Sequence, residues 1–310
     1  MITINNLSKN YDKRMLLDKV SLTINRNEKI GLIGPNGAGK TTLFSLILGE
    51  VEQSSGTIEM HKNIHIGYLP QEAHFDSQRS VLQELTEGDD RINKLKKELR
   101  ELEEKNQADS ERYGEVMHEL ETLGIFELEH KAKKIAAGLG FKERDFDRPI
   151  NNLSGGWKMR TLLARLLIYQ YDLLLLDEPT NYLDLNAALW LKDYLSRFSG
   201  TMVIISHDKI FLNEVTNYTL VLERGRLTKV KGNYEQYEKI KEGSRASLEK
   251  QFKEQEKKRK QLEAFAQRFH AQPNRAAAVR NKRKMLERMP QILLPEDRRS
   301  IRHFEFPQTK

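Results

Sequence analysis

The sequence predicts an α/β fold built on a mostly parallel sheet, followed by an α-helical hairpin. Short runs rich in Ile, Leu and Val alternate with helical patterns over residues 1–237. Two of these runs, Leu173–Leu176 and Met202–Ile205, are apolar without alternation, as strands buried on both faces of a parallel sheet are. From Glu238 the chain becomes charge-dense and helix-favouring. We therefore expect two domains, 1–237 and 238–310.

Each predicted strand is a short apolar run bounded by Gly, Asn or Asp, which favour turns. Helical patterns separate most of these runs, which is the chain order of an α/β domain. The predicted strands are Ile2–Leu7, Val20–Ile24, Lys29–Gly34, Ile64–Leu69, Leu173–Asp177, Thr201–Ser206, Thr219–Glu223 and Arg226–Lys231.

Residues 91–123 interrupt the alternation with a predicted helical hairpin. Apolar residues recur at 3-4-3 spacing from Ile92 to Leu102 on an otherwise charged helix. The segment 106–110 breaks this pattern, and a second apolar seam begins at Tyr113. Two interpretations remain open, a solvated helical insertion and a docking surface.

The composition excludes several classes of protein. The chain has no cysteine, which rules out a disulfide framework, thiolate chemistry and Cys-ligated zinc. Its longest apolar stretches are far shorter than the ~20 residues that a membrane span needs. The N-terminus is polar where a signal peptide needs an apolar core. We therefore expect a soluble, cytoplasmic protein without membrane insertion.

The net charge of +7 is unevenly distributed along the chain. Residues 238–310 carry 20 Lys and Arg against 10 Asp and Glu, whereas residues 1–237 carry 32 against 35. The stretch from Ala264 to Lys284 has no acidic residue. An anionic partner is therefore expected at the tail rather than at the first domain. The basic residues of this stretch are Arg268, Arg275, Arg280, Lys282, Arg283 and Lys284.

The segment 34–42 matches the phosphate-binding pattern G-x-x-x-x-G-K-[ST]. It follows an apolar strand and opens a helical run, which is the context that the pattern requires. Its glycines let backbone N–H groups converge on phosphates, and the helix N-terminus adds partial positive charge. We expect Lys40 to reach the β- and γ-phosphates and Thr41 to bind Mg²⁺. The predicted nucleotide-binding residues of this loop are Gly34, Pro35, Asn36, Gly37, Ala38, Gly39, Lys40, Thr41 and Thr42.

Two carboxylates, Asp177 and Glu178, follow the buried run Leu173–Leu176. Ligand sites in open α/β sheets lie at the carboxyl ends of the strands. An apolar run followed by Asp-Glu is common by itself, but beside a phosphate loop it indicates catalysis. We expect Asp177 on the Mg²⁺ side and Glu178 to orient or deprotonate a water.

Residues 153–157, Leu-Ser-Gly-Gly-Trp, open an apolar-periodic helix upstream of Asp177. Ser154 is well placed to cap this helix. Ser-Gly-Gly at a helix N-terminus also offers a second anion-binding site. Taken alone, the segment favours an ordinary capped helix.

With these motifs in order, residues 1–237 resemble the ATP-binding cassette ATPases. The resemblance implies a RecA-like parallel core, an antiparallel β subdomain, a helical subdomain, and hydrolysis of ATP with Mg²⁺. Tyr11 is similar to the aromatic residue that stacks on adenine. Gln71 is similar to the Q-loop glutamine that contacts Mg²⁺ and the attacking water. His207 is similar to the switch histidine that senses the γ-phosphate.

Two further segments resemble motifs of this family. Asn181 and Asp184 match the D-loop. In the family, two cassettes dimerise head to tail, and the signature loop of one closes over the nucleotide of the other. This chain has one phosphate loop and one signature loop, so the resemblance implies a second cassette, as a homodimer or in a longer tandem protein. Trp157 departs from the Gln of many cassettes, which leaves its contacts undefined, and is familiar in a soluble branch. The residues matching the signature loop are Leu153, Ser154, Gly155, Gly156 and Trp157.

The tail is predicted to form two helices around a short turn. The first is expected over Lys239–Ala271, with Gly243 as a weak point, and Pro273 breaks it. The second is expected over Ala276–Met289. A solvated coiled coil is one interpretation. The acid-free stretch around the turn favours binding to RNA phosphates, with contacts that position rather than specify.

The Leu-Ser-Gly-Gly-Trp loop, the helical insertion and the basic hairpin together resemble the F subfamily of ATP-binding cassette proteins. The resemblance implies a cytosolic translation factor whose hairpin linker reaches tRNA or rRNA on the ribosome. It also implies an arm at 91–123 and a second cassette beyond residue 310. Two alternatives stay open: the ATPase subunit of an importer with separate membrane subunits, and a nucleic-acid-binding module without catalysis.

Overall fold

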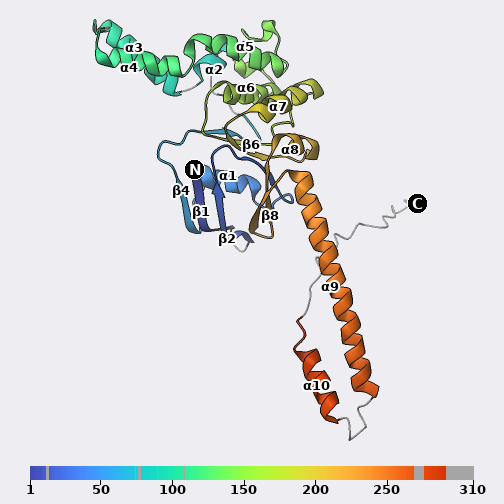
Figure 1. Cartoon of the computed structure of the whole chain (residues 1–310). Coiled ribbons are helices and arrows are strands. Elements are labelled where there is room, and N and C mark those ends of the chain that lie inside the picture. The colour runs from blue at the N-terminus through green and yellow to red at the C-terminus, as the bar shows by residue number, and fades with distance from the viewer. Residues whose placement is uncertain are drawn as a thin grey trace, which may run out of the picture. The chain divides into compact units, whose positions relative to one another are not determined.

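The computed structural model describes residues 1–11, 14–73, 75, 78–88, 90–107, 109–268 and 276–290. The chain forms two compact units, Met1–Tyr237 and Glu238–Lys310. Figure 1 shows the first unit as two sheets covered by helices. The predicted α/β class is confirmed.

The larger sheet has six strands in the order β5-β6-β7-β3-β8-β9. All neighbours are parallel except β8 and β9, which form an antiparallel hairpin. The sequence predicted these strands to within about two residues at each end. Their bounds are β3 Lys29–Ile33, β5 Ile66–Leu69, β6 Leu173–Asp177, β7 Thr201–Ile205, β8 Tyr218–Glu223 and β9 Arg226–Lys231.

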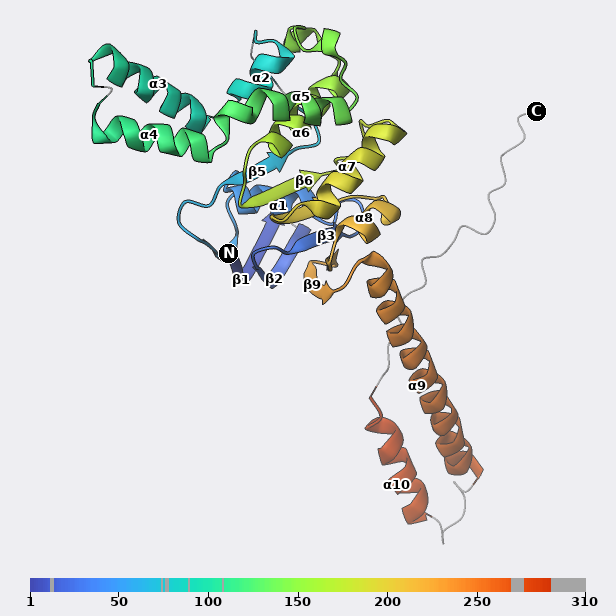
Figure 2. The ribbon, with the colours of Figure 1, turned by 45° about the horizontal axis from the view of Figure 1, so that its top comes forward.

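Both faces of the central strands are buried. In β6, Leu174 and Leu176 join one hydrophobic core, and Leu173 and Leu175 join the other. The first core lies under helices α7 (Leu185–Arg197) and α8 (Lys209–Val215), as Figure 2 shows. The second holds α1 (Lys40–Leu48) between the two sheets. An uninterrupted apolar run is therefore what this strand needs.

The smaller sheet is antiparallel, with the order β2-β1-β4. Its strands are β1 Ile2–Tyr11, β2 Arg14–Ile24 and β4 Ser55–Met60. The sequence missed β4, because its exposed residues are mostly polar and it is stabilised by pairing with β1. It also shortened β1 and β2, whose polar ends pair with each other.

A helical region lies on the side of the larger sheet away from the smaller one (Figures 1 and 2). The predicted insertion at 91–123 contains α3 and α4, whose buried side chains include Ile92, Val116 and Leu120. The guanidinium of Arg112 on α4 forms two hydrogen bonds with the carboxylate of Glu98 on α3. The helices of this region are α2 Val81–Glu87, α3 Asp90–Glu104, α4 Glu111–Thr122, α5 Leu128–Gly138 and α6 Gly155–Ile168.

The second unit contains most of α9 (Tyr234–Arg268) and α10 (Ala276–Glu287). Helix α9 runs unbroken through Gly243, the expected weak point. Its Leu262 and Ala266 are buried, and the Gln255 side chain donates a hydrogen bond to the Pro290 carbonyl at 2.6 Å. Across the described residues, none of the helices is both long and apolar enough to cross a membrane.

Candidate functional site

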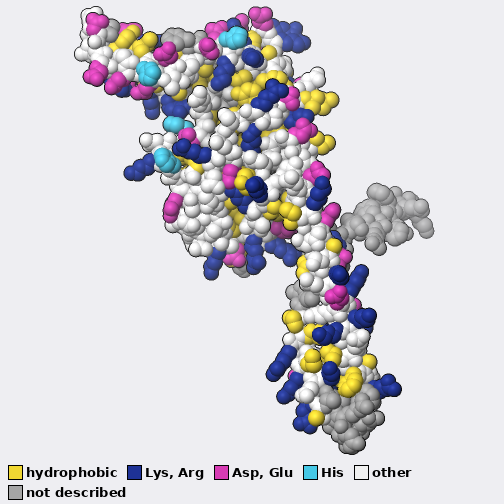
Figure 3. All heavy atoms as spheres, viewed as in Figure 1, with side chains coloured by type: hydrophobic (Ala, Val, Ile, Leu, Met, Phe, Trp, Pro, Cys, Tyr) yellow, Lys and Arg dark blue, Asp and Glu magenta, His cyan; other side chains and the backbone are white. Residues whose placement is uncertain are grey.

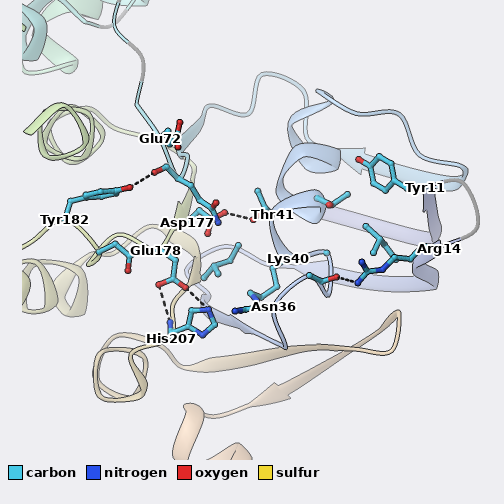
Figure 4. A pocket seen from close by; sticks show the side chains of 17 residues that line it. Tyr11, Arg14, Asn36, Lys40, Thr41, Glu72, Asp177, Glu178, Tyr182 and His207 are labelled. Atoms are coloured by element: carbon cyan, nitrogen blue, oxygen red, sulfur yellow. Dashed lines mark hydrogen bonds and ion pairs between the residues drawn. The ribbon is translucent and has the colours of Figure 1, made fainter. Parts of the chain in front are cut away.

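Four neighbouring parallel strands deliver the predicted site residues to one edge of the larger sheet. The phosphate loop follows β3, the carboxylates end β6, His207 follows β7, and Gln71 follows β5. A cavity of about 770 Å³ opens there (Figure 4). The predicted residues that line it are Tyr11, Asn36, Gly37, Gly39, Lys40, Thr41, Thr42, Gln71, Asp177, Glu178, Asn181 and His207.

The loop between β3 and α1 is shaped to hold an anion. Gly37 and Gly39 adopt left-handed backbone angles, with φ of 71° and 103°. A Cβ on Gly34 would come within 2.3 Å of the Leu222 carbonyl oxygen, so only glycine fits there. Helix α1 begins without a side-chain cap, which leaves its first N–H groups for a ligand. The Lys40 ammonium donates to the carbonyls of Gly34 and Pro35, at 3.0 and 3.2 Å.

Asp177, at the end of β6, lies next to Thr41 at the start of α1. The Thr41 hydroxyl donates to Asp177 Oδ2 at 2.7 Å, and Gln71 also hydrogen-bonds this carboxylate. Burial raises the pKa of Asp177, and the Thr41 and Gln71 hydrogen bonds partly oppose the rise. Among the described residues, none hydrogen-bonds the buried Oδ1. A carboxylate oxygen left without a donor beside a phosphate loop fits a divalent cation.

Glu178 is held in a strained backbone conformation. Its φ is 51°, the left-handed region that glutamate rarely adopts, and its N–H donates to the Ile205 carbonyl at 2.9 Å. The carboxylate accepts a hydrogen bond from the His207 backbone N–H at 3.3 Å and lies 3.5 Å from His207 Nε2. Burial raises the pKa of Glu178, and the charge of Asp177 adds to the rise. A buried carboxylate with a raised pKa suits proton abstraction.

The mouth of the cavity carries one expected and one unexpected residue. Tyr11, at the end of β1, is 47% exposed, with the Lys9 ammonium 4.8 Å from its ring centroid. Arg14, which pairs with Tyr11 across the β1–β2 hairpin, donates to the Gly37 carbonyl at 2.8 Å. The sequence did not point to Arg14, because β2 was predicted to begin at Val20. Extending β2 toward its N-terminus until it pairs with Tyr11 would have placed Arg14 next to the phosphate loop.

Residues 153–157 do not line this cavity. Ser154 occupies the N-cap of α6, but its side chain makes no capping hydrogen bond, so the predicted side-chain cap is wrong. A Cβ on Gly155 would meet nothing within 4 Å. The Trp157 ring packs edge-on against Phe141 at 4.8 Å. This loop therefore keeps an exposed hydroxyl and an open glycine at a helix N-terminus.

The two D-loop residues make contacts within the chain. The Asn181 N–H donates to the Glu178 carbonyl at 3.2 Å, which fixes the turn after the carboxylates. Asp184 caps α7 by accepting from the Ala187 N–H at 3.0 Å, and its other oxygen accepts from Arg160 at 3.0 Å. These hydrogen bonds hold the pKa of Asp184 below its ordinary value.

Lys and Arg side chains lie along the described helices of the hairpin unit (Figure 3). Arg268 is exposed at the end of α9, whereas Arg275 lies outside the described residues. On α10, Arg280, Arg283 and Lys284 are exposed, but Lys282 is half-buried. The four α10 cations therefore do not form one equivalent set.

Comparison with known proteins identifies the family. A family model described as ABC transporter matches residues 17–181, and a second model with the same description matches residues 220–306. The chain belongs to the ABC transporter family. The cassette and its extension together account for most of the sequence.

Several curated relatives resemble this ABC protein along almost its whole length. The human ATP-binding cassette sub-family F member 3 is 33% identical over 312 residues, which cover 99% of this chain and 43% of that protein. The probable ATP-binding protein YheS of Escherichia coli (strain K12) is 33% identical over 94% of this chain and 45% of its own length. The chain thus spans about half the length of the curated relatives it matches, and it is an ABC-F type ATP-binding protein.

Solved structures share the fold of the ABC cassette. One described as an ATP binding subunit of an ABC transporter has a TM-score of 0.56 at 19% identity, covering 74% of this chain and 90% of that one. A dimeric post-hydrolysis structure of the cassette MJ0796 bound to ADP and Pi has a TM-score of 0.55 at 20% identity, covering 74% and 98%.

Proposed function

We propose that this protein hydrolyses ATP and uses the reaction to control its binding to the ribosome. The observation that carries the catalytic part is the meeting of Lys40, Thr41, Asp177, Glu178 and His207 around one cavity. Each is the residue type that phosphoryl transfer to water needs at its place.

In the proposed reaction the phosphate loop binds and orients the nucleotide. Tyr11 stacks on adenine at the mouth. Lys40 exchanges its loop carbonyls for the β- and γ-phosphates, and the first N–H groups of α1 donate to the same oxygens. Glu178 accepts a proton from a water aligned with the γ-phosphorus, and the P–O bond to ADP breaks as the water oxygen attacks. His207, against Glu178, senses the γ-phosphate.

Thr41, Gln71 and Asp177 would hold Mg²⁺. The fit rests on the unpartnered Oδ1 of Asp177 and on the hydroxyl that already meets Oδ2. When bound, the ion neutralises charge that develops on the phosphate oxygens. Few protein ligands are required, because Mg²⁺ takes its remaining ligands from phosphates and waters.

Residues 153–157 are proposed to contact the nucleotide that is bound to a partner cassette. The Ser154 hydroxyl makes no capping hydrogen bond, and a Cβ on Gly155 would meet no atom within 4 Å. A phosphate of the nucleotide bound to another cassette can therefore approach this helix N-terminus. Since these residues do not line the chain's own cavity, a second copy or a second cassette is needed to complete each site.

The hairpin unit is proposed to contact tRNA or rRNA in the cytoplasm. Residues 238–310 carry the whole positive excess of the chain, and exposed cations lie on both described helices. Arg and Lys side chains neutralise backbone phosphates without reading bases. Closure of two cassettes by ATP would hold the hairpin on RNA, and hydrolysis would release it.

Co-sedimentation with ribosomes in ATP, in ADP and without nucleotide tests the proposal. The Glu178→Gln variant keeps the shape of the side chain but lacks the base, so we expect it to pellet with ribosomes in ATP and not in ADP. Nucleotide-independent pelleting would favour a nucleic-acid-binding module without catalysis. No ribosome binding, together with co-purification of a membrane protein, would favour an importer subunit.

A further inference from the structure

The first residues of β2 lie against the two left-handed glycines of the phosphate loop. The Arg14 guanidinium donates to the Gly37 carbonyl at 2.8 Å (Figure 4). Two residues further along the strand, the Cβ of Leu16 lies 3.5 Å from the position that a Cβ on Gly39 would occupy. Residues two apart on a strand point to the same face of the sheet. One face of β2 therefore meets both glycines.

The peptide group between Gly37 and Ala38 is held at both ends. Its carbonyl oxygen accepts from Arg14, and its N–H donates to the Pro35 carbonyl at 3.1 Å. Glycine adopts left- and right-handed backbone angles with similar ease, so a Gly37 with φ of 71° does not by itself fix this peptide group in one orientation. Rotation of the group would redirect the chain just before helix α1. The Arg14 hydrogen bond thus restrains the loop where the backbone itself restrains it least.

A second side chain that holds the loop is expected to leave it when a nucleotide binds. The Lys40 ammonium donates to the carbonyls of Gly34 and Pro35. In the proposed reaction Lys40 exchanges these carbonyls for phosphate oxygens. The Arg14 hydrogen bond comes from the smaller sheet and involves a different carbonyl, so it does not have to break at that step.

We propose that Arg14 is a positioning residue that keeps the phosphate loop in its nucleotide-binding conformation before the nucleotide arrives. It acts through the Gly37 carbonyl rather than through the nucleotide. The loop is then ordered when the protein folds, so binding loses less conformational entropy. The inference deepens the proposed function and rests on it, because ATP must bind at this loop.

Replacing Arg14 should weaken the binding of every nucleotide by the same factor. A loop that is only partly in the binding conformation raises the apparent Kd by the inverse of that fraction, whichever nucleotide follows. Loss of one solvent-exposed hydrogen bond corresponds to a factor of about 5 to 10. A direct contact with the γ-phosphate would instead weaken ATP more than ADP. A direct contact with the base would weaken ATP and GTP unequally.

The experiment measures binding of Mg²⁺-nucleotides to the full chain by isothermal titration calorimetry. We expect Arg14→Gln to raise the Kd for ATP, ADP and GTP equally, by about 5- to 10-fold. Stopped-flow mixing with a fluorescent ATP analogue should show slower association and an unchanged dissociation rate, because the bound state keeps its contacts with the nucleotide. Arg26→Gln is the matched control. It removes the same charge from an exposed residue that does not line the cavity, and it should leave all three Kd values unchanged.

Hydrogen–deuterium exchange of residues 34–42 measures the order of the loop directly. Without nucleotide, these amides should exchange faster in Arg14→Gln than in the parent chain or in Arg26→Gln. Saturating ATP should remove the difference, because the bound nucleotide then orders the loop. Thermal melting without nucleotide checks that both variants are folded, as substitution of an exposed side chain predicts.

The outcomes separate this inference from the proposed function. Unequal losses among ATP, ADP and GTP, or faster dissociation from Arg14→Gln, would mean that Arg14 contacts the nucleotide and would overturn the positioning role. An unchanged affinity or loop exchange in Arg14→Gln, or an equal loss in Arg26→Gln, would also overturn it. Each of these results leaves ATP binding by the chain intact. Failure of the parent chain to bind ATP overturns the proposed function and the inference with it.

Discussion

Neutralising one face of α10 should weaken RNA binding by an amount that the helix geometry sets. At about 100° per residue, Arg280, Arg283 and Lys284 share a face, and all three are exposed. Lys282 points about 160° away from Arg280, toward the side that carries the half-buried Leu286. At most three of the four cations can therefore meet one phosphate backbone.

Each neutralised phosphate contributes roughly 0.7–0.9 to the slope of log K against log salt concentration. The triple variant Arg280→Gln, Arg283→Gln, Lys284→Gln should therefore reduce that slope by about 2 to 3. Lys282→Gln should leave it almost unchanged. Glutamine has nearly the same helix propensity as lysine and arginine, so the helix is retained.

Fluorescence anisotropy with a labelled RNA hairpin, over a series of salt concentrations, measures both slopes on the full chain. Circular dichroism checks that helix content is equal in all variants. An equal loss from Lys282→Gln alone, or an unchanged slope in the triple variant, would refute the assignment of α10's exposed face to RNA.

Further outcomes are expected at the ATP site, in the core and at one exposed position. Glu178→Gln should lower ATP turnover by about 10²–10⁴-fold. Because burial raises the Glu178 pKa, ionisation costs stability as pH rises above the ordinary value of 4.5. The variant should therefore melt higher than the parent at pH 7 without nucleotide, a gain that vanishes below pH 4.5. Thr41→Val removes the 2.7 Å donor to Asp177 and should raise the Mg²⁺ concentration needed for half-maximal turnover. Leu175→Ala, at a fully buried position, should cost about 2–5 kcal/mol in urea unfolding. Leu185→Ala, 74% exposed, should cost no more than about 0.5 kcal/mol.

The sequence was sufficient for elements whose own residues carry the signal. The central strand β6 has four consecutive leucines, because both of its faces are buried. The glycines of the phosphate loop and the carboxylates after the buried strand can be recognised directly in the sequence. The phosphate loop, Asp177 and Glu178 could therefore be named from the residues themselves, whereas Tyr11, Gln71 and His207 were named from the resemblance to the ATP-binding cassette ATPases.

Features that depend on a partner segment were not accessible in the same way. Strand β4 is polar and is held by pairing with β1. The cap at Ser154 was predicted from residue type, but the serine side chain makes no capping hydrogen bond to the helix N–H groups. Arg14 and Lys282 differ from other surface cations only through what lies opposite them. One-dimensional patterns contain no such neighbours.

The left-handed backbone of Glu178 bears on how such proteins lose their activity. Glycine and asparagine adopt a φ of 51° more easily than glutamate does. A lineage released from the need for a carboxylate would thus gain stability by drifting to either residue at this position. Cassettes that have lost catalysis should consequently carry Gly or Asn at the position that follows the aspartate equivalent to Asp177. A glutamate at this position costs stability through its strained backbone, so only a continued need for its carboxylate would preserve it.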